Sequence, residues 1–80
     1  STKYLVDIAE AYRQLGIFDQ AQQLYLYLIE IVPIDMKEQF YLPLIRAAFA
    51  NGNYTLVDDY ASQYTYSFPK GEFSQDILFF

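Results

Sequence analysis

The chain has 80 residues, of which 54% are hydrophobic and 20% aromatic, and its formal net charge is −5. A chain of this length forms one domain or a part of one, and it buries only about 60% of the surface that its unfolded form exposes. The sequence therefore supplies more apolar surface than so small a globule can hide. We expect part of that surface to contact a partner.

The ionisable residues exclude several classes of protein. The five Lys and Arg residues are spread along the chain, whereas nucleic-acid binding requires clustered positive charge. The absence of Cys and His removes the thiol nucleophile, the commonest general base and the usual transition-metal ligands. The apolar runs are too short to span a membrane, and the first residues lack a signal-peptide pattern. We expect no enzymatic activity, nucleic acid, metal, cofactor or direct membrane insertion.

The first half of the chain has the apolar periodicity of two helices. Apolar residues recur at three- and four-residue steps over residues 2–15, and Gly16 suits the left-handed position after a helix. A second helix is predicted over residues 18–31, with Pro33 beyond its end. Because only two residues separate these helices, they should form an antiparallel pair.

The second half predicts three more helices. Asp35 and Glu38 have the spacing of a capping box that opens a third helix ending near residue 51. Pro43 inside that helix predicts a kink. The sequence Asn-Gly-Asn at 51–53 separates it from a fourth helix over 54–67, and Gly71 is expected to cap a fifth that contains the sequence SQDILFF. No segment alternates like a strand, so the predicted fold class is all-α.

The sequence repeats itself at a step of 36 residues. Gly16 and Gly52 are separated by this step, and so are Pro33 and Pro69. The predicted organisation is one helical repeat domain over residues 1–80, with a first repeat at about 2–35, a second at about 36–71 and the start of a third at about 72–80.

The first repeat follows a spaced series of apolar, small and aromatic residues: Leu5, Ile8, Ala9, Tyr12, Gly16, Phe18, Ala21, Tyr25 and Pro33. This series resembles the framework of the tetratricopeptide repeat (TPR) family, and the 36-residue step is similar to that of members found in bacterial envelopes. In the second repeat Ile45 and Ala48 stand where the first has Ala9 and Tyr12, and Val57 and Ala61 replace Ala21 and Tyr25. Exchanging large and small residues between facing sites can conserve core volume.

The TPR resemblance implies a fragment of an α-solenoid that acts as a protein-protein interaction scaffold. Such a module would bind a partner segment in a concave groove formed by the first helices of successive repeats. It would do so in an envelope assembly or export complex, in the periplasm or otherwise in the cytoplasm. The corresponding groove residues are Lys3, Asp7, Glu10, Arg13, Gln39, Leu42, Arg46, Phe49 and Phe79.

Within this groove the residue types predict different roles. Arg46 and Phe49 belong to the types that dominate interface energetics; the alternative is that Phe49 packs inside the chain and Arg46 is solvated. Lys3 with Asp7, and Glu10 with Arg13, have the spacing of ordinary helix-surface ion pairs. Asp7 and Glu10 would repel the acidic tails that some TPR proteins bind.

Two other functions stay open at this stage. Leu26 and Tyr27 occupy positions that are usually polar in the family, so they are candidates for a homo-oligomer contact or for a contact with another part of a longer protein. A sugar-binding domain is a less favoured alternative, because Tyr60, Tyr64 and Phe68 form one helical stripe that is better interpreted as core. Tyr66 lies off this stripe and should be exposed.

The 36-residue step also predicts which of the last four residues face the core and which face the groove. Ile77 and Phe80 align with Tyr41 and Leu44, and Phe80 also aligns with Ile8, so these positions are predicted to face the core. Leu78 and Phe79 align with groove positions, and Phe79 should stay partly exposed.

Overall fold

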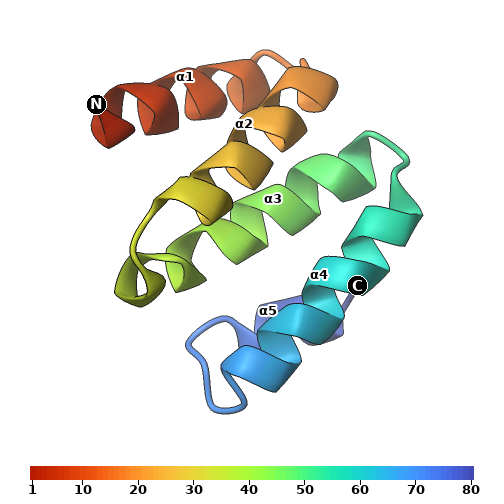
Figure 1. Ribbon diagram of the computed structural model, residues 1–80. Coiled ribbons are helices and arrows are strands. Elements are labelled where there is room, and N and C mark those ends of the chain that lie inside the picture. The colour runs from red at the N-terminus through yellow and green to blue at the C-terminus, as the bar shows by residue number, and fades with distance from the viewer.

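The computed structural model describes residues 1–80 and is entirely helical. Its elements are α1 (Thr2–Gln14), α2 (Phe18–Ile31), the short 3-10 helix η1 (Ile34–Met36), α3 (Glu38–Ala50), α4 (Tyr54–Ser67) and α5 (Ser74–Leu78). Each of the four long helices packs against the next one along the chain (Figure 1). The predicted all-α class and the absence of strands are confirmed.

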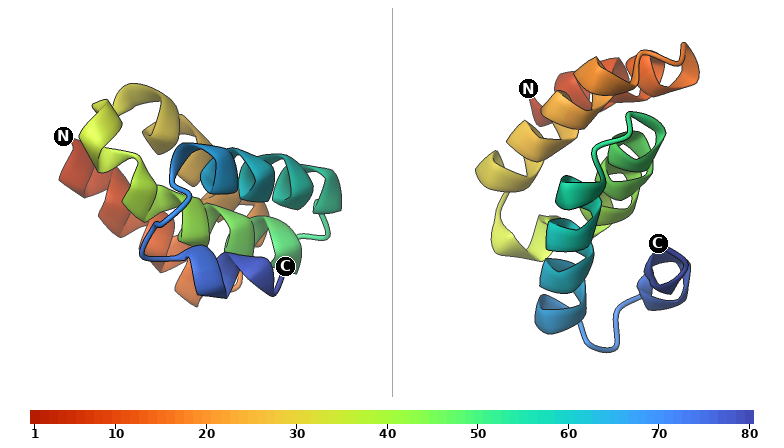
Figure 2. Two further views of the ribbon diagram at one scale, coloured as in Figure 1. Left: turned by 90° about the horizontal axis from the view of Figure 1, so that it is seen from below. Right: turned by 90° about the vertical axis from the view of Figure 1, so that its right-hand side faces the viewer.

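The helices lie in two layers. Seen from below, α1, α3 and α5 lie side by side, and α2 and α4 lie over them (Figure 2, left). The first helices of the predicted repeats therefore share one layer and the second helices share the other. The packing of α2 on α3 joins one helical pair to the next.

The 36-residue step of the sequence is also the step of the structure. Helices α1 and α3 each have 13 residues and begin 36 positions apart. Helices α2 and α4 each have 14 residues and are related in the same way. Helix α5 begins at Ser74, 36 residues after the start of α3. The backbone thus contains two helical pairs with the same helix lengths, followed by the short helix α5 at the same offset.

The turns inside the two pairs have the same hydrogen bonds. Gly16 and Gly52 adopt left-handed φ values of 78° and 75°. The next amide reaches back five residues in each pair, from Ile17 to the Tyr12 carbonyl and from Asn53 to the Ala48 carbonyl, both at 2.9 Å. This is the Schellman arrangement, in which a glycine ends the helix without the steric cost that a Cβ brings at positive φ. The predicted left-handed position of Gly16 is confirmed, and Gly52 adopts the same conformation after α3.

The core consists of one cluster that runs through both pairs. Ala9 and Ala21 are fully buried in the first pair, and their equivalents Ile45 and Val57 are buried in the second. The exchange of large and small residues therefore takes place at core positions. Tyr41 packs its ring against the rings of the predicted stripe on α4, which are those of Tyr60, Tyr64 and Phe68.

Two predicted helix starts are wrong. Asp35 does not cap α3, because residues after Pro33 first form η1, and α3 begins at Glu38 without any side-chain cap bond. Gly71 lies three residues before α5. Its actual role is steric: a Cβ at this position would lie 2.2 Å from the hydroxyl of Tyr64. Helix α3 continues through Pro43 without interruption.

The predicted burial is right for Ile77 and wrong for two other residues. Ile77 is buried against α4, whereas Phe80 keeps 39% of its surface exposed because α5 ends at Leu78. Ile8 is also 39% exposed, because α2 is the only helix that packs extensively on α1. Tyr66 is exposed and Tyr64 is fully buried, as predicted.

Tyr64 and Glu38 form a hydrogen-bonded cluster across the second pair, which we call the Tyr64 cluster. The Tyr64 hydroxyl donates to the Glu38 carboxylate at 2.8 Å and accepts from the Phe73 amide at 2.8 Å. The same Glu38 oxygen accepts from the Glu72 amide at 3.1 Å. These bonds tie the start of α3 to the end of α4 and to the segment before α5, and Gly71 leaves room for them.

We predict that Gly71→Ala destabilises the fold by about 1–3 kcal/mol, because the added methyl group displaces the Tyr64 hydroxyl. The loss should be smaller in a Tyr64→Phe background, where the nearest obstructing atom is absent. Urea unfolding of the two single variants and the double variant measures this coupling. Gly52→Ala is the matched control: its cost arises from positive φ alone, so it should be equal in both backgrounds. Equal costs for Gly71→Ala in the two backgrounds would show that the added methyl group does not act through the Tyr64 hydroxyl, and would contradict this role of the Tyr64 cluster.

Candidate functional site

The layer formed by α1, α3 and α5 carries most of the predicted groove residues. On α1 the charges pair with one another: Lys3 lies 3.2 Å from Asp7, and Arg13 lies 2.9 Å from Glu10. Both predicted ion pairs are confirmed. The first pair is highly exposed and the second is about 40% exposed. Because each of these charges is paired with an opposite one, the charges at the α1 end of the layer cancel.

Glu10 also forms a contact that the sequence did not reveal. The hydroxyl of Tyr25, a buried residue of α2, donates to the Glu10 carboxylate. The hydrogen bond from Arg13 lowers the pKa of Glu10 most, and the bond from Tyr25 lowers it further. Burial raises the pKa of the Tyr25 hydroxyl well above its ordinary range, and the Glu10 bond adds to this. Glu10 is therefore a fixed anion that joins α1 to α2.

A sequence signal for this contact exists in retrospect. Tyr25 lies on the apolar stripe of α2, and a buried tyrosine needs an acceptor for its hydroxyl. Glu10 is the carboxylate of the facing helix that reaches it.

On α3 the predicted groove residues differ in accessibility. Gln39 and Arg46 are exposed, but Leu42 is buried and is not available to a partner. The prediction for Leu42 is wrong because it treated one side of α3 as free, whereas α3 packs against α2, α4 and α5 and has few exposed positions. Arg46 takes part in neither of the two ion pairs.

An aromatic cluster lies one turn beyond Arg46. The ring of Phe49 lies 5.4 Å from the ring of Tyr54 and 5.4 Å from that of Phe80. We call these three residues the Phe49 cluster, and each keeps between 39% and 59% of its surface exposed. Phe79 beside it is 88% exposed. Phe49 therefore packs partly inside the chain and partly faces solvent, which combines the two alternatives posed by the sequence.

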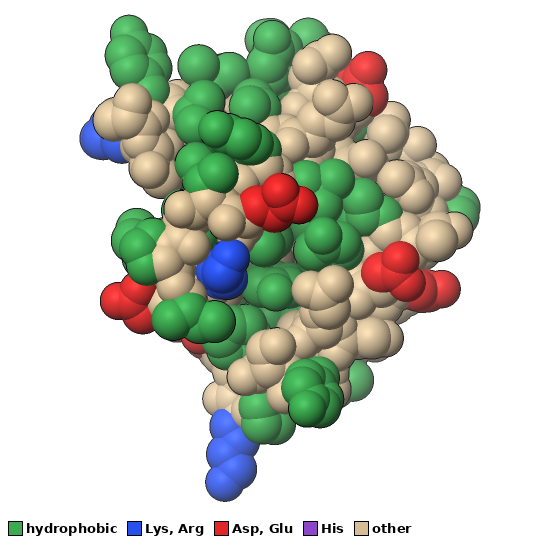
Figure 3. All heavy atoms as spheres, viewed as in Figure 1, with side chains coloured by type: hydrophobic (Ala, Val, Ile, Leu, Met, Phe, Trp, Pro, Cys, Tyr) green, Lys and Arg blue, Asp and Glu red, His purple; other side chains and the backbone are tan.

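Of the two candidate contact residues on α2, Leu26 and Tyr27, only one is fully accessible to a partner. Tyr27 is exposed, whereas Leu26 is partly buried against the core. Leu26 therefore offers less surface to a partner than Tyr27 does. Figure 3 shows that hydrophobic side chains on this side of the molecule reach the surface between scattered acidic groups.

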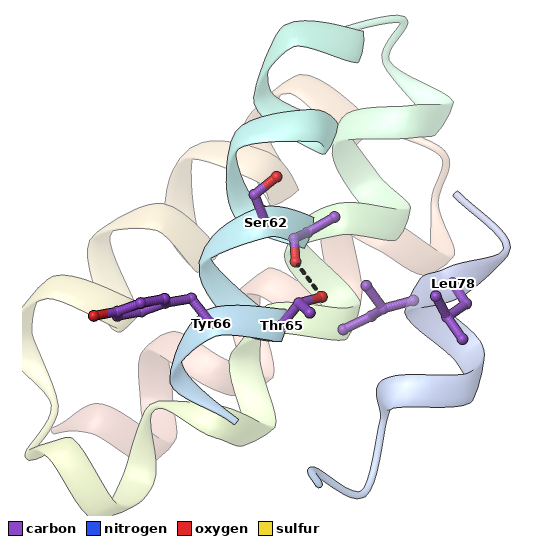
Figure 4. A pocket seen from close by; sticks show the side chains of 6 residues that line it. Ser62, Thr65, Tyr66 and Leu78 are labelled. Carbon is purple, nitrogen blue, oxygen red and sulfur yellow. Dashed lines mark hydrogen bonds between the residues drawn. The ribbon is translucent and has the colours of Figure 1, made fainter. Parts of the chain in front are cut away.

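An open recess of about 490 Å³ lies between α4 and α5. It is lined by Ala61, Ser62, Thr65, Tyr66, Ile77 and Leu78. The Thr65 side chain turns toward α5 and its hydroxyl donates to the Ala61 carbonyl at 3.0 Å, whereas Tyr66 points away (Figure 4). The recess has no acidic or basic side chain, so it offers apolar contact and no acid-base chemistry.

No three acidic side chains gather where they could hold a metal ion. None of the helices combines the length and the apolar character needed to cross a bilayer. No family model matches the chain, and no curated protein and no solved structure is significantly similar to it.

We predict that Glu10 stabilises the fold in a pH-dependent way. Its pKa is lowered from 4.5 in the folded chain, so its contribution is complete above about pH 4.5 and is lost as the pH falls through the folded-state value. Because the carboxylate is partly exposed, the contribution should be about 1 kcal/mol or less. Urea unfolding from pH 2 to pH 7 should show a loss for Glu10→Gln at neutral pH that disappears in acid.

Tyr25→Phe provides the matched control for this prediction, since it removes one donor to Glu10 and keeps the carboxylate and Arg13. Its pH dependence should lie between those of the parent and Glu10→Gln. A Glu10→Gln variant whose stability runs parallel to that of the parent at every pH would contradict the assignment.

Proposed function

We propose that this chain is a TPR-like helical repeat domain whose function is to bind another protein. The support for the repeat assignment is structural as well as sequential, because helix lengths, turns and core positions all recur after 36 residues. The proposed binding surface is the layer of α1, α3 and α5. The domain would act without enzymatic chemistry, as a scaffold.

The observation that carries this proposal is the position of Arg46 next to the Phe49 cluster. An exposed guanidinium outside any ion pair lies one helical turn from partly exposed aromatic rings. Arg and aromatic residues are the types that dominate binding energy at protein interfaces. The surface thus combines an apolar anchor site with a charge that has no partner in the chain.

The same surface indicates the chemistry of the partner. An aromatic or aliphatic side chain would cover the Phe49 cluster and Phe79, and an acidic side chain near it would pair with Arg46. The charges on α1 are already paired, so they would contribute rim contacts and less energy. The proposed ligand is therefore a short segment with an apolar anchor followed or preceded by a carboxylate.

Selection from a random peptide library tests this function. We expect the selected peptides to contain an apolar residue near an acidic one, and Arg46→Glu or Phe49→Ala to weaken their binding about tenfold or more. Tyr66→Glu on α4 is the control, and it should leave the affinity unchanged. Peptides that bind both groove variants as tightly as the parent would place the site elsewhere, and a selection that yields no binder would refute the proposed function.

A further inference from the structure

The turn between α3 and α4 contains an asparagine followed by a glycine, Asn51 and Gly52. Asparagine is chemically labile, and this dipeptide is its most reactive context, because the main-chain nitrogen after the asparagine attacks the side-chain carbonyl carbon. Glycine has no Cβ and leaves that nitrogen accessible. The chain has one other asparagine, Asn53, which is followed by the bulky Tyr54. Asn51 is therefore the position at which the sequence favours deamidation.

The folded turn holds Asn51 in a geometry that prevents this reaction. Ring closure requires the Gly52 nitrogen to eclipse the Cβ atom of Asn51 about the Cα–C bond. The ψ of −2° at Asn51 makes it eclipse the main-chain nitrogen of Asn51 instead. The Gly52 amide also donates to the Phe49 carbonyl at 3.0 Å. The turn must therefore open before the two groups can react.

A hydrogen bond to α2 holds the side chain of the same residue. The side-chain amide of Asn51 donates to Gln22 at 3.2 Å. Gln22 is the one buried residue whose side chain is an amide or carries a charge. This bond therefore depends on the packing of α2 against α3. Asn51 itself is exposed, so water and hydroxide reach it as soon as the contact opens.

We propose that Asn51 is a site of spontaneous deamidation whose rate is set by opening of the α2–α3 contact. In the open turn the Gly52 nitrogen loses its proton to hydroxide and bonds to the side-chain carbonyl carbon of Asn51. The side-chain nitrogen takes a proton from water and leaves as ammonia, which closes a five-membered imide. Addition of water at the side-chain carbonyl of the imide gives aspartate, and addition at the main-chain carbonyl gives isoaspartate. This inference does not rest on the proposed peptide-binding function.

The modification weakens the contact that delays it. Neither product has the amide group that donates to Gln22, and aspartate keeps a bond there only if Gln22 reverses its own amide. Isoaspartate also adds one carbon to the main chain of the turn. In this turn the amides of Gly52 and Asn53 donate to the carbonyls of Phe49 and Ala48, and these bonds end α3. An irreversible chemical change is thereby coupled to a loss of packing between the two helical pairs.

Incubation of the full chain at neutral pH tests the proposal. Ion-exchange chromatography resolves the added negative charge, and peptide mapping by mass spectrometry locates it. We expect Gln22→Ala to accelerate the loss of Asn51 about two- to tenfold, because it removes one net hydrogen bond from the closed state. Unfolding in urea should accelerate the loss about tenfold or more, because it removes the closed state altogether. The purified isoaspartate form should unfold at a lower urea concentration than the parent.

Tyr25→Phe is the matched control. It removes the hydrogen bond between α2 and α1 and leaves the α2–α3 contact intact, so Asn51 should be lost at the parent rate. Equal acceleration by Tyr25→Phe and Gln22→Ala would show that only global unfolding exposes Asn51, and it would overturn the gating. Survival of Asn51 in the urea-unfolded chain, or modification of Asn53 in its place, would overturn the site itself. An isoaspartate form as stable as the parent would overturn the coupling to packing.

A second variant decides the question if Gln22→Ala loses its helical circular dichroism. Lys37→Met removes the bond from the Lys37 ammonium to the Ile29 carbonyl, at the other end of the α2–α3 contact. It leaves the turn around Asn51 untouched, so acceleration in this variant acts through the contact alone. A folded Lys37→Met variant that loses Asn51 at the parent rate refutes the proposal.

Discussion

The packing of α2 against α3 is the interaction on which the rest of the structure depends. Helix α3 packs against α4 within its own pair and against α2 of the other pair, so the contact between pairs buries a second side of α3. Phe40, Leu44 and Ala47 are buried, and they share one side of α3 with Asn51, which bonds to Gln22 of α2. Two polar bonds fix the ends of the contact: Asn51 donates to Gln22, and the Lys37 ammonium donates to the Ile29 carbonyl. Without this contact each pair would be an isolated two-helix hairpin, and the apolar residues at the α2–α3 contact would be exposed to solvent.

The two pairs share a backbone but are held by different polar contacts. In the first pair Tyr25 of α2 donates to Glu10 of α1. In the second pair Tyr64 of α4 donates to Glu38 of α3. The residues 36 positions away from each tyrosine are Ala61 and Leu28, so neither bond is repeated. Each pair thus has one tyrosine–glutamate bond, and the two bonds lie at positions that are not equivalent under the 36-residue step.

Sequence periodicity predicted the long helices well, because their causes are local. Positive-φ glycines, apolar stripes and the 36-residue step all act within one or two helical turns, and the bounds of α2 and α4 agree with the prediction. The errors occur where distant residues decide the outcome. Glu38 was assigned to a capping box, but residues from another part of the chain, Tyr64 and Glu72, use its carboxylate.

The sequence predicted which residue types form the candidate site, but it predicted less well which of them are accessible to solvent. The exposure of Arg46 and the partial exposure of Phe49 were open to sequence reasoning, because both lie off the core stripe. The burial of Leu42 and the bond between Tyr25 and Glu10 depend on how neighbouring helices pack. A single amphipathic pattern does not specify such contacts, since α3 is covered on several sides.

Native-state hydrogen exchange followed by NMR tests the central role of the α2–α3 contact most directly. Local opening divides a protein into cooperative units of different stability. If this contact holds the two pairs together, the amides of α2 and α3 should exchange together and most slowly, those of α1 and α4 faster, and those of α5 fastest. Exchange of α1 with α2 as one unit and of α3 with α4 as another, each with its own free energy of opening, would contradict the account.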